Sequence, residues 1–361
     1  MKIALLSYST KPRGGVVHTL ALAEALAALG EDVTVWTLGR GGDTGFFRPV
    51  HPAVRIQVVP FPDGGPEESV GARILRSITT LRTAFDPTPY DVVHAQDCIS
   101  ANAAGPCVRT VHHLDHFTTP ELAACHERAI VEPPAHVCVS AAVAGELAAG
   151  WGIEAQVIPN GVAYDRFAAT DPTARASWRS RLGPYVLTVG GIEPRKGSLD
   201  LLEAYALLRA TRPDVRLVIA GGETLFDYRA YRTRWEARAA ELAVDPVVLG
   251  QVGEDQLPSL VAAADVFAFP SLKEGFGLAA MEALAAGVPL VVRDLPVLRE
   301  VFGGAAQFAS TPQDLAAELG RALATEDPDR RSAGRALAAR HTWDAAARSH
   351  LDFYRSLGAR A

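Results

Sequence analysis

One stretch of the sequence, residues 269–282, constrains the fold more than any other. It follows a short apolar run, 265–269, and it carries two glycines, Gly275 and Gly277, before an alanine-rich segment at 278–286. This order predicts a buried strand, a tight glycine turn and the beginning of a helix. Such a turn directs free backbone N–H groups and the positive end of a helix at one point, which is an arrangement that suits a phosphate.

Two acidic residues, Glu274 and Glu282, border this predicted anion pocket. Acid pairs at this spacing are frequent, and Glu282 could be an ordinary solvated helix residue. However, the alanine, methionine and leucine residues around Glu282 look buried, and an ionised carboxylate in such surroundings needs partners. Carboxylates beside a phosphate have a simple task if they accept hydrogen bonds from sugar hydroxyls. We therefore interpret the stretch as part of a site for a nucleotide-sugar.

The rest of the chain alternates apolar strands with helices in two halves. The expected strands of the first half are 2–8, 32–38, 54–59, 90–95, 106–111 and 135–139. Those of the second half are 185–189, 215–219, 247–252, 265–269, 288–292 and 306–309. This alternation predicts α/β domains with parallel, doubly wound sheets, which bind ligands at the carboxyl ends of their strands.

The chain of 361 residues is long enough for two domains. We expect a first domain at 1–165, a polar linker at 166–183, a second domain at 184–341 and a C-terminal helix at 342–361. The net charge of −6 gives no general attraction to nucleic acid or anionic lipid. Because the sequence has neither a signal-like start nor an apolar run of about 18 residues, it predicts a cytoplasmic protein.

A basic pair, Arg195 and Lys196, follows the expected strand 185–189 at the beginning of a helix. The planar fork of an arginine and the point charge of a lysine could together neutralise a diphosphate. An exposed basic pair is the ordinary alternative. The position after a strand and before Gly197 favours the functional interpretation.

In the first half, Gly14–Gly15 and His112 also follow expected strands. A glycine pair before a helix lets a ligand approach the backbone closely, although a plain loop is about as common. A single histidine at the end of a strand is usually structural. The neighbouring side chains of His113, Asp115 and His116 modestly favour a polar site.

Several patterns are absent or carry little weight. The Gly-x-Gly-x-x-Gly fingerprint of dinucleotide-binding proteins does not follow the first strand. The one Asp-x-Asp, 327–329, begins a helix far from any strand end, so a metal-bridged diphosphate site is not supported. The region 94–138 contains four cysteines and six histidines, but at spacings that favour buried thiols over a zinc site. Arginines interleave with apolar residues at 70–85, where a core-facing helix is favoured over a membrane-bound one.

Taken together, these motifs resemble glycosyltransferase family 4, whose members are retaining enzymes of the GT-B fold. The resemblance covers nearly the whole chain. It is carried by Glu274-Gly-Phe-Gly-Leu with Glu282, by 286–289, by the loop 190–197, by 158–162 with Phe167, by 110–112, and by Trp343 with Tyr354.

The resemblance implies a fold and a set of roles. The fold is two Rossmann-like domains that face each other across a cleft, with the helix 342–361 crossing back to the first, acceptor-side domain. The catalytic group is Arg195, Lys196, Glu274 and His112, in which the basic pair holds the donor diphosphate. The donor-binding residues are Gly15 near the phosphates, Gly191 in the glycine loop, Val252 near the base, Phe276, Gly277 and Leu278 at the transferred sugar, and Glu282 at the ribose hydroxyls.

The implied reaction is the metal-independent transfer of a sugar, with retention, from a nucleotide-diphosphate sugar to an acceptor hydroxyl. We expect a UDP- or GDP-sugar as donor and no further cofactor. The acceptor, a small molecule, a lipid or a glycan, is not implied, because the short loop that Arg13 and Val16 flank departs from the family pattern. Two alternatives remain open at this point: a nucleotide-sugar epimerase of the same architecture, and a binder of nucleotide-sugars without catalytic activity.

Overall fold

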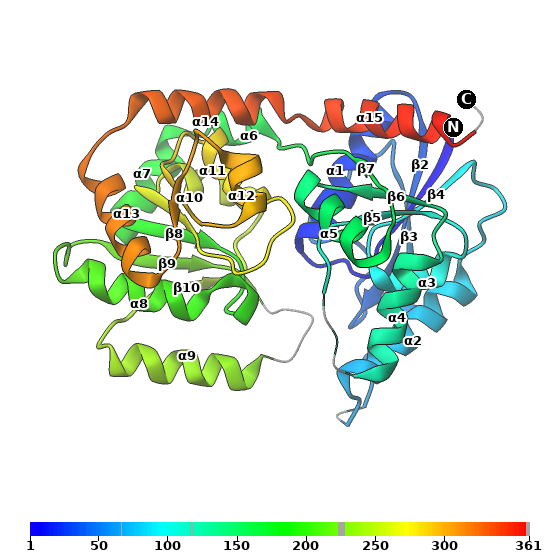
Figure 1. The fold of residues 1–361 in the computed structure, drawn as a ribbon, viewed down its shortest axis with the longest axis horizontal. Coiled ribbons are helices and arrows are strands. Elements are labelled where there is room, and N and C mark those ends of the chain that lie inside the picture. Colours follow the sequence, from blue (N-terminus) through cyan, green and yellow to red (C-terminus); the bar gives the residue numbers. More distant parts are fainter. Residues whose placement is uncertain (66, 116, 118, 223–227, 359–361) are drawn as a thin grey trace. The chain divides into compact units, whose positions relative to one another are not determined.

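The computed structural model describes residues 1–65, 67–115, 117, 119–222 and 228–358. The chain forms two compact units, which we call the first unit (residues 1–161 and 343–361) and the second unit (residues 162–342). Each unit is built on a parallel β-sheet that is flanked by helices (Figure 1).

The sheet of the first unit has the strand order β3-β2-β1-β4-β5-β6-β7, and all its pairings are parallel. Its strands are β1 (Lys2–Leu6), β2 (Asp32–Arg40), β3 (Arg55–Phe61), β4 (Val92–Ala95), β5 (Val108–Val111), β6 (Ala135–Cys138) and β7 (Gln156–Val157). Its helices are α1 (Gly14–Ala28), α2 (Val70–Ala84), α3 (Cys98–Ala104), α4 (Pro120–Val131), α5 (Ala141–Trp151) and α15 (Trp343–Ser356). The strand order reverses between β1 and β4, which is where doubly wound sheets place their ligands.

Strand β1 is buried on both faces, and its side chains alternate between two cores. Ile3 and Leu5 join a cluster that includes residues of α1 and α15, whereas Ala4 and Leu6 join one that includes residues of α2 and α3. This explains the continuous apolar run, because a strand covered on both sides has no polar face. Helix α15 packs on α1 within the first unit.

The sheet of the second unit has the strand order β10-β9-β8-β11-β12-β13 and is also parallel throughout. Its strands are β8 (Tyr185–Val189), β9 (Arg216–Ala220), β10 (Val247–Gly250), β11 (Val266–Phe269), β12 (Leu290–Arg293) and β13 (Gln307–Ala309). Its helices are α6 (Tyr164–Ala168), α7 (Pro172–Leu182), the short 3-10 turn η1 (Pro194–Lys196), α8 (Ser198–Arg209), α9 (Arg229–Glu241), α10 (Leu257–Ala262), α11 (Leu278–Ala285), α12 (Pro296–Phe302), α13 (Pro312–Ala324) and α14 (Pro328–Arg340). Here the order reverses between β8 and β11.

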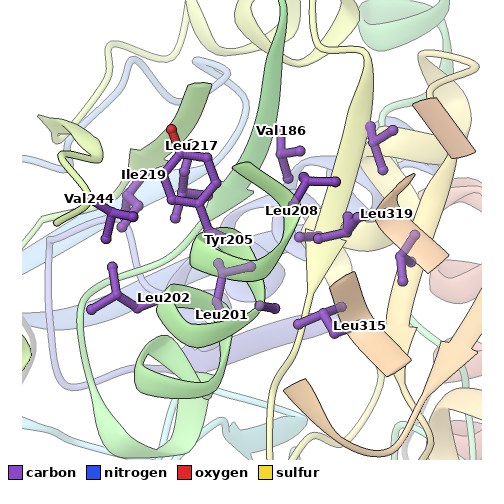
Figure 2. Packing of buried hydrophobic residues seen from close by; sticks show 14 of the residues in the cluster. Val186, Leu201, Leu202, Tyr205, Leu208, Leu217, Ile219, Val244, Leu315 and Leu319 are labelled. Carbon is purple, nitrogen blue, oxygen red and sulfur yellow. The ribbon is translucent and has the colours of Figure 1, made fainter. Parts of the chain in front are cut away.

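The core of the second unit fixes helix α8 against the sheet (Figure 2). Leu201, Leu202 and Leu208 of α8 are at most 3% exposed, and they pack with residues of β8, β9 and α13. Full burial of such a side chain contributes roughly 1.5–3 kcal/mol. The phenol of Tyr205 is buried in the same cluster and donates to the carbonyl of Val215 at 3.2 Å. The N-terminus of α8, which follows the basic pair, is therefore held in one position.

The segment 166–183, which the sequence predicts as a linker, contains most of helix α6 and the whole of α7. The carboxylate of Asp171 caps α7 by accepting from the N–H of Thr173, and Pro172 stands in the first turn. Phe167 and Leu182 are buried, and α7 packs against α10 inside the second unit. The polar composition of the segment hides this structure, because only Leu182 of α7 is fully buried.

Helix α2 carries the arginines that suggested a membrane-bound helix. Arg76 forms an ion pair with Glu68 at 2.7 Å, and Arg82 donates to the carbonyl of Asn102 at 2.5 Å. Ile74 and Ile78 are buried, and the helix packs on α3, as expected for a core-facing helix. Within the described part of the chain, no helix combines the length and the apolar character that crossing a membrane requires.

Gly197 permits the close approach of the two loops that follow β8 and β11. Its φ of +65° is left-handed, and a Cβ there would lie 2.2 Å from the carbonyl oxygen of Pro270. We therefore expect Gly197→Ala to lower the free energy of unfolding by about 3 kcal/mol or more, because a left-handed backbone and an overpacked contact both act against it. Urea denaturation measures this change.

Gly152 is the matched control for this substitution. It has nearly the same φ, +66°, but a Cβ there meets nothing within 4 Å. Gly152→Ala should cost only about 1–2 kcal/mol, which is the left-handed penalty alone. Equal losses in the two variants would contradict the proposed contact with Pro270.

Candidate functional site

The second unit brings the basic pair and the glycine turn together. Nζ of Lys196 lies 2.5 Å from Oε1 of Glu274, and Nη1 of Arg195 lies 3.2 Å from the same oxygen. The same Nη1 also donates to the carbonyl of Lys273 at 3.2 Å. We call Arg195, Lys196 and Glu274 the ion cluster. It joins the loop after β8 to the loop after β11, where the strand order of the sheet reverses.

Local structure places the ion cluster. Pro194 begins the 3-10 turn η1, which presents both basic side chains within three residues, and Gly197 ends it. The N–H of Leu272 donates to the carbonyl of Arg195 at 2.8 Å, so the backbones of the two loops are also bonded. The result is a fixed pair of cations at the beginning of α8, where the helix dipole adds positive potential.

Glu274 is ionised in this environment. Burial would raise the pKa of its carboxyl, but the charges of Lys196 and Arg195 outweigh burial and hold that pKa at about 2. The side chain is only 10% exposed. A carboxylate in such a place persists because it is paired, and its unshared lone pairs can accept further hydrogen bonds.

The glycine turn leads into helix α11 as the sequence predicts. Gly277 is the N-cap of α11 with a φ of +100°, and a Cβ there would meet the ring of Phe302 at 3.0 Å. Phe276 is buried, and Leu278 is the first helical residue. The first N–H groups of α11 have no acceptor within the helix, so they remain available for an anion or a hydroxyl oxygen.

Glu282 lies in a different electrostatic setting from Glu274. Burial and, to a smaller extent, the charge of Glu254 raise the pKa of its carboxyl to about 8, although the charge of Arg166 acts in the opposite direction. Arg166 forms an ion pair with Glu254 at 2.8 Å. The sequence analysis missed these two neighbours. Glu254 could have been found because it follows the expected strand 247–252, whereas nothing in the sequence connects Arg166 to this place.

Two further predicted donor residues lie beside these groups. Gly191 lines a small cavity with Lys196 and Ser271, between the ends of β8 and β11. Val252 lies just beyond β10 and two residues before Glu254, so it is nearer in sequence to the surroundings of Glu282 than to the ion cluster. In the second unit, some predicted residues therefore lie at the ion cluster, whereas Glu282 lies with Glu254 and Arg166.

The first unit brings Gly15 and His112 together. Gly15 lies in the first turn of α1, and a Cβ there would lie 3.7 Å from Cδ2 of His112. His112 follows β5 and is half-buried. Burial lowers the pKa of His112 well below its usual value, and the charge of Arg109 lowers it further. His112 is therefore a neutral imidazole at physiological pH.

His112 belongs to a cluster of four histidines that the sequence analysis did not predict. The ring of His18 lies 4.8 Å from that of His112, and the ring of His350 lies 6.3 Å from His18 and 5.6 Å from His94. Burial lowers the pKa of His18, His94 and His350 as well. The cluster draws on α1, β4, the end of β5 and α15, so no local pattern in the sequence reveals it.

Hydrogen bonds fix the orientation of these rings. Nδ1 of His350 donates to the carbonyl of Ala346 at 2.8 Å, and His94 bonds both the phenol of Tyr354 and the hydroxyl of Thr110 at 2.6 Å. Nδ1 of His18 pairs with Oδ1 of Asn160 at 2.8 Å, so it carries the proton. The ring that faces His112 is therefore held in one tautomer.

The region rich in cysteine and histidine forms no metal centre in the described part of the chain. There, no three His, Cys, Asp or Glu side chains lie close enough to hold a metal ion, and all four cysteines are free thiols. His113 pairs with Asp115 at 3.2 Å, and His136 bonds the carbonyl of Ile130 at 2.8 Å. His116 lies outside the described residues.

The buried histidines predict instability in mild acid. The pKa of His350 is lowered to about 4 by burial from its usual 6.5, so below pH 6.5 the unfolded chain binds a proton that the folded protein does not. Stability is therefore lost as the pH falls from 6.5, by about 2 kcal/mol at pH 5 for this residue alone. His350→Phe should reduce that loss, as measured by urea denaturation at pH 7 and pH 5.

The exposed His51 provides the control, because His51→Phe should leave the pH dependence unchanged. If the His350 variant lost as much stability between pH 7 and pH 5 as the parent protein, the buried neutral imidazole would be excluded.

Glu282 predicts the opposite dependence on pH. The unfolded carboxyl releases its proton near pH 4.5, but the folded one holds it until about pH 8. The free energy of unfolding therefore falls as the pH rises between these values. Glu282→Gln removes this loss, so we expect the variant to be more stable at pH 8 by about 4 kcal/mol.

Thermal unfolding at pH 5 and pH 8 measures this difference. The exposed Glu326 lies in the same unit, and Glu326→Gln should change stability equally little at both pH values. A Glu282→Gln variant that is less stable than the parent at pH 8 would show that the carboxyl is ionised and paired.

Comparison with known proteins identifies the family. A model described as "Glycosyltransferase Family 4" matches residues 12–166, and one described as "Glycosyl transferases group 1" matches residues 172–339. The chain is 31% identical to a D-inositol 3-phosphate glycosyltransferase of Xylanimonas cellulosilytica, over 98% of this chain and 96% of that protein. It is 30% identical to a phosphatidyl-myo-inositol mannosyltransferase of Mycobacterium tuberculosis, over 83% of this chain and 80% of that protein.

Solved structures of similar fold agree with this assignment. HepE of Anabaena, solved in complex with UDP and glucose, superposes with a TM-score of 0.75 at 21% identity and covers 99% of this chain and 100% of its own. This likeness confirms the GT-B fold. The curated relatives that we report are all glycosyltransferases, so the epimerase alternative receives no support. The chain therefore belongs to glycosyltransferase family 4, and it is a glycosyltransferase.

Proposed function

We propose that this glycosyltransferase takes its sugar from a nucleotide-diphosphate sugar and transfers it, with retention and without a metal ion, to an acceptor hydroxyl. The observation that carries the proposal is the ion cluster. Two cations from one loop share one oxygen of a buried carboxylate from the next loop, at 2.5 and 3.2 Å. The beginnings of two helices, α8 and α11, follow these loops.

The diphosphate would bind to the basic pair. Arg195 brings a planar fork and Lys196 a compact charge with up to three donors, and both already contact Glu274. When the bond between sugar and phosphate breaks, negative charge develops on the leaving diphosphate. The two cations and the helix N-termini stabilise that charge without rearranging, which is the most effective form of electrostatic catalysis.

The two carboxyl groups would bind hydroxyls at the two ends of the donor. Glu274 is ionised and accepts hydrogen bonds from the transferred sugar, together with the backbone N–H groups of 276–278. Glu282, whose pKa of about 8 keeps it protonated at neutral pH, can both donate to and accept from the ribose hydroxyls. The backbone at Val252 would meet the base, and Gly191 would lie against the phosphates.

In the first unit, Gly15 and His112 would contact the phosphates and the sugar of the donor. The missing side chain of Gly15 leaves room beside the imidazole of His112. Because this imidazole is neutral, it can donate or accept one hydrogen bond without repelling the basic pair. His18, which lies edge-on to His112 at 4.8 Å, would keep the ring in place.

The donor is best sought among UDP- and GDP-sugars. HepE, which has the same fold, binds UDP and glucose, and this supports a nucleotide-sugar here. The names of the curated relatives point to inositol-type acceptors, one of them soluble and one a lipid. This chain would accordingly use a polyol or lipid-linked acceptor.

Lys196→Ala tests the proposal directly. Loss of one contact to the developing charge lowers kcat by roughly 10²–10³-fold, or about 2.7–4 kcal/mol. We expect a loss of this size in sugar transfer, or in slow hydrolysis of the donor, with the fold intact by thermal unfolding. A panel of UDP-, GDP-, ADP- and TDP-sugars, screened by thermal shift, selects the donor, since a ligand at 100 times its Kd stabilises the protein by about 2.7 kcal/mol.

Lys2→Ala is the control, because Lys2 is exposed on strand β1 of the other unit. It should change neither turnover nor the thermal shift. Unchanged turnover in a folded Lys196→Ala variant would refute the role of the ion cluster. Stabilisation by a donor that is neither hydrolysed nor transferred to any acceptor would refute the reaction itself.

A further inference from the structure

Three arginines lie near one another in the first unit, two of them against the ring of Tyr8. The guanidinium carbons of Arg13 and Arg40 lie 5.9 and 5.7 Å from the centre of the Tyr8 ring. Arg73 is close enough to Arg40 for their charges to interact, as is Arg13. We call Arg13, Arg40 and Arg73 the arginine cluster.

The topology of the sheet creates the arginine cluster. Tyr8 follows β1, Arg40 ends β2, and Arg13 precedes α1. Strands β1 and β2 are parallel neighbours, so their carboxyl ends lie at the same edge of the sheet. Arg73 lies in the first turn of α2. Three segments that are far apart in the sequence therefore bring guanidinium groups to the edge at which doubly wound sheets bind ligands.

Two of these arginines have donors that nothing in the described residues satisfies. Nε of Arg13 and Nε of Arg40 are buried and have no hydrogen-bond partner among the described residues. Nη2 of Arg40 donates to the hydroxyl of Ser77 at 3.1 Å, which holds the guanidinium but leaves its Nε unused. A buried unpaired donor costs about 1–3 kcal/mol, and more for a charged group. An acceptor at this place would remove that cost.

Among the described residues, no ion pair joins Arg13 or Arg40 to a carboxylate. The charge of Glu68 acts on Arg40 and Arg73, but Glu68 is already paired with Arg76 at 2.7 Å. Asp97 also acts on Arg40, but its oxygens already accept from the N–H groups of Tyr8 at 3.0 Å and Ser100 at 2.8 Å. Burial lowers the pKa of Arg40, and the charges of Arg73 and Arg13 lower it further.

A purely structural role would account for only part of this arrangement. The guanidinium of Arg40 contacts the rings of Tyr8 and Phe61, at 5.7 and 5.4 Å, and such contacts stabilise a fold. These ring contacts explain where the guanidinium of Arg40 lies, but they do not explain why the Nε atoms of Arg13 and Arg40 are buried without an acceptor among the described residues.

We propose that the arginine cluster binds a phosphate group carried by the acceptor. Guanidinium forks match the geometry of phosphate oxygens, and several cations suit a dianion better than a single carboxylate. Arg13 stands two residues before Gly15, which contacts His112, so the phosphate would lie next to the predicted reaction site of this unit. The assignment to the acceptor rests on the proposed function, whereas the binding of phosphate does not.

Isothermal titration with inorganic phosphate tests the site. The titration is done on a Lys196→Ala background, because the ion cluster of the second unit would also attract phosphate. We expect this protein to bind phosphate, and we expect Arg13→Gln with Arg40→Gln to weaken that binding at least tenfold. Arg55→Gln is the matched control, since Arg55 lies on β3 and pairs with Asp32 at the opposite edge of the sheet.

Two outcomes would overturn the proposal: no binding of phosphate by the Lys196→Ala protein, or equal binding after both arginines are replaced. Thermal unfolding checks that the variants fold. If the double variant does not fold, Arg13→Gln alone tests the site, because Arg13 is a partly exposed loop residue. Arg40→Lys should also weaken phosphate binding, because it keeps the charge but loses the planar fork.

Further experiments identify the source of the phosphate and show whether the donor site is unaffected. Sedimentation with phosphatidylglycerol vesicles that depends on Arg13 and Arg40 indicates a lipid-linked phosphate. Competition by glycerol 3-phosphate without vesicle binding indicates a soluble ester. With Lys196 intact, the Arg13→Gln and Arg40→Gln double variant should keep the thermal shift that a UDP- or GDP-sugar produces. Loss of phosphate binding is then distinguishable from failure of the donor site. Loss of that shift as well would mean a general defect and would count against a separate site.

Discussion

The pairing of Lys196 and Arg195 with the carboxylate of Glu274 is the interaction on which the proposed donor site depends. Buried charges persist only when they are paired, and here one oxygen takes both cations. The pairing joins the loop after β8 to the loop after β11, so it both closes the end of the sheet and presets the site. Because this pairing already holds both cations in place, the proposed site would need little reorganisation to meet the charge that develops on a leaving diphosphate.

Several buried ionisable groups in other parts of the molecule lower its stability at some pH values. The carboxyl of Glu282, with a pKa near 8, and the buried histidines around His112 are all groups whose burial disfavours their charged form. An alanine or phenylalanine would fill these places more stably at one pH or another. Their retention is understandable if the protonated carboxyl and the neutral imidazole are the forms that bind hydroxyls and phosphates, a common trade between stability and function.

Much of this could be predicted from the sequence, because the signals are local. The apolar runs before Gly14, Arg195 and Gly275 have the length and composition of parallel strands, and polar residues directly after them must lie at one edge of a sheet. The arginine cluster, His18, His350 and Arg166 escaped prediction for the opposite reason. Each is an ordinary residue on its own element, and only the tertiary fold makes it a neighbour of the site. The segment 166–183 looks like a linker in the sequence because its helix α7 is short and polar, with only Leu182 buried.

The two units place a cation and a glycine at corresponding points of their sheets. In each sheet the order reverses next to its first strand, and the segment after that strand carries a cation and a glycine, Arg13 with Gly14 in one unit and Arg195 with Gly197 in the other. With both proposed sites, a chain with a net charge of −6 would bind two anions through local clusters of positive charge. Local concentration of charge, rather than overall basicity, is what an enzyme needs if donor and acceptor both bring phosphate. The salt dependence of binding should then be steep for phosphate-bearing ligands and weak for a neutral acceptor, because salt screens the attraction between these clusters and a charged ligand.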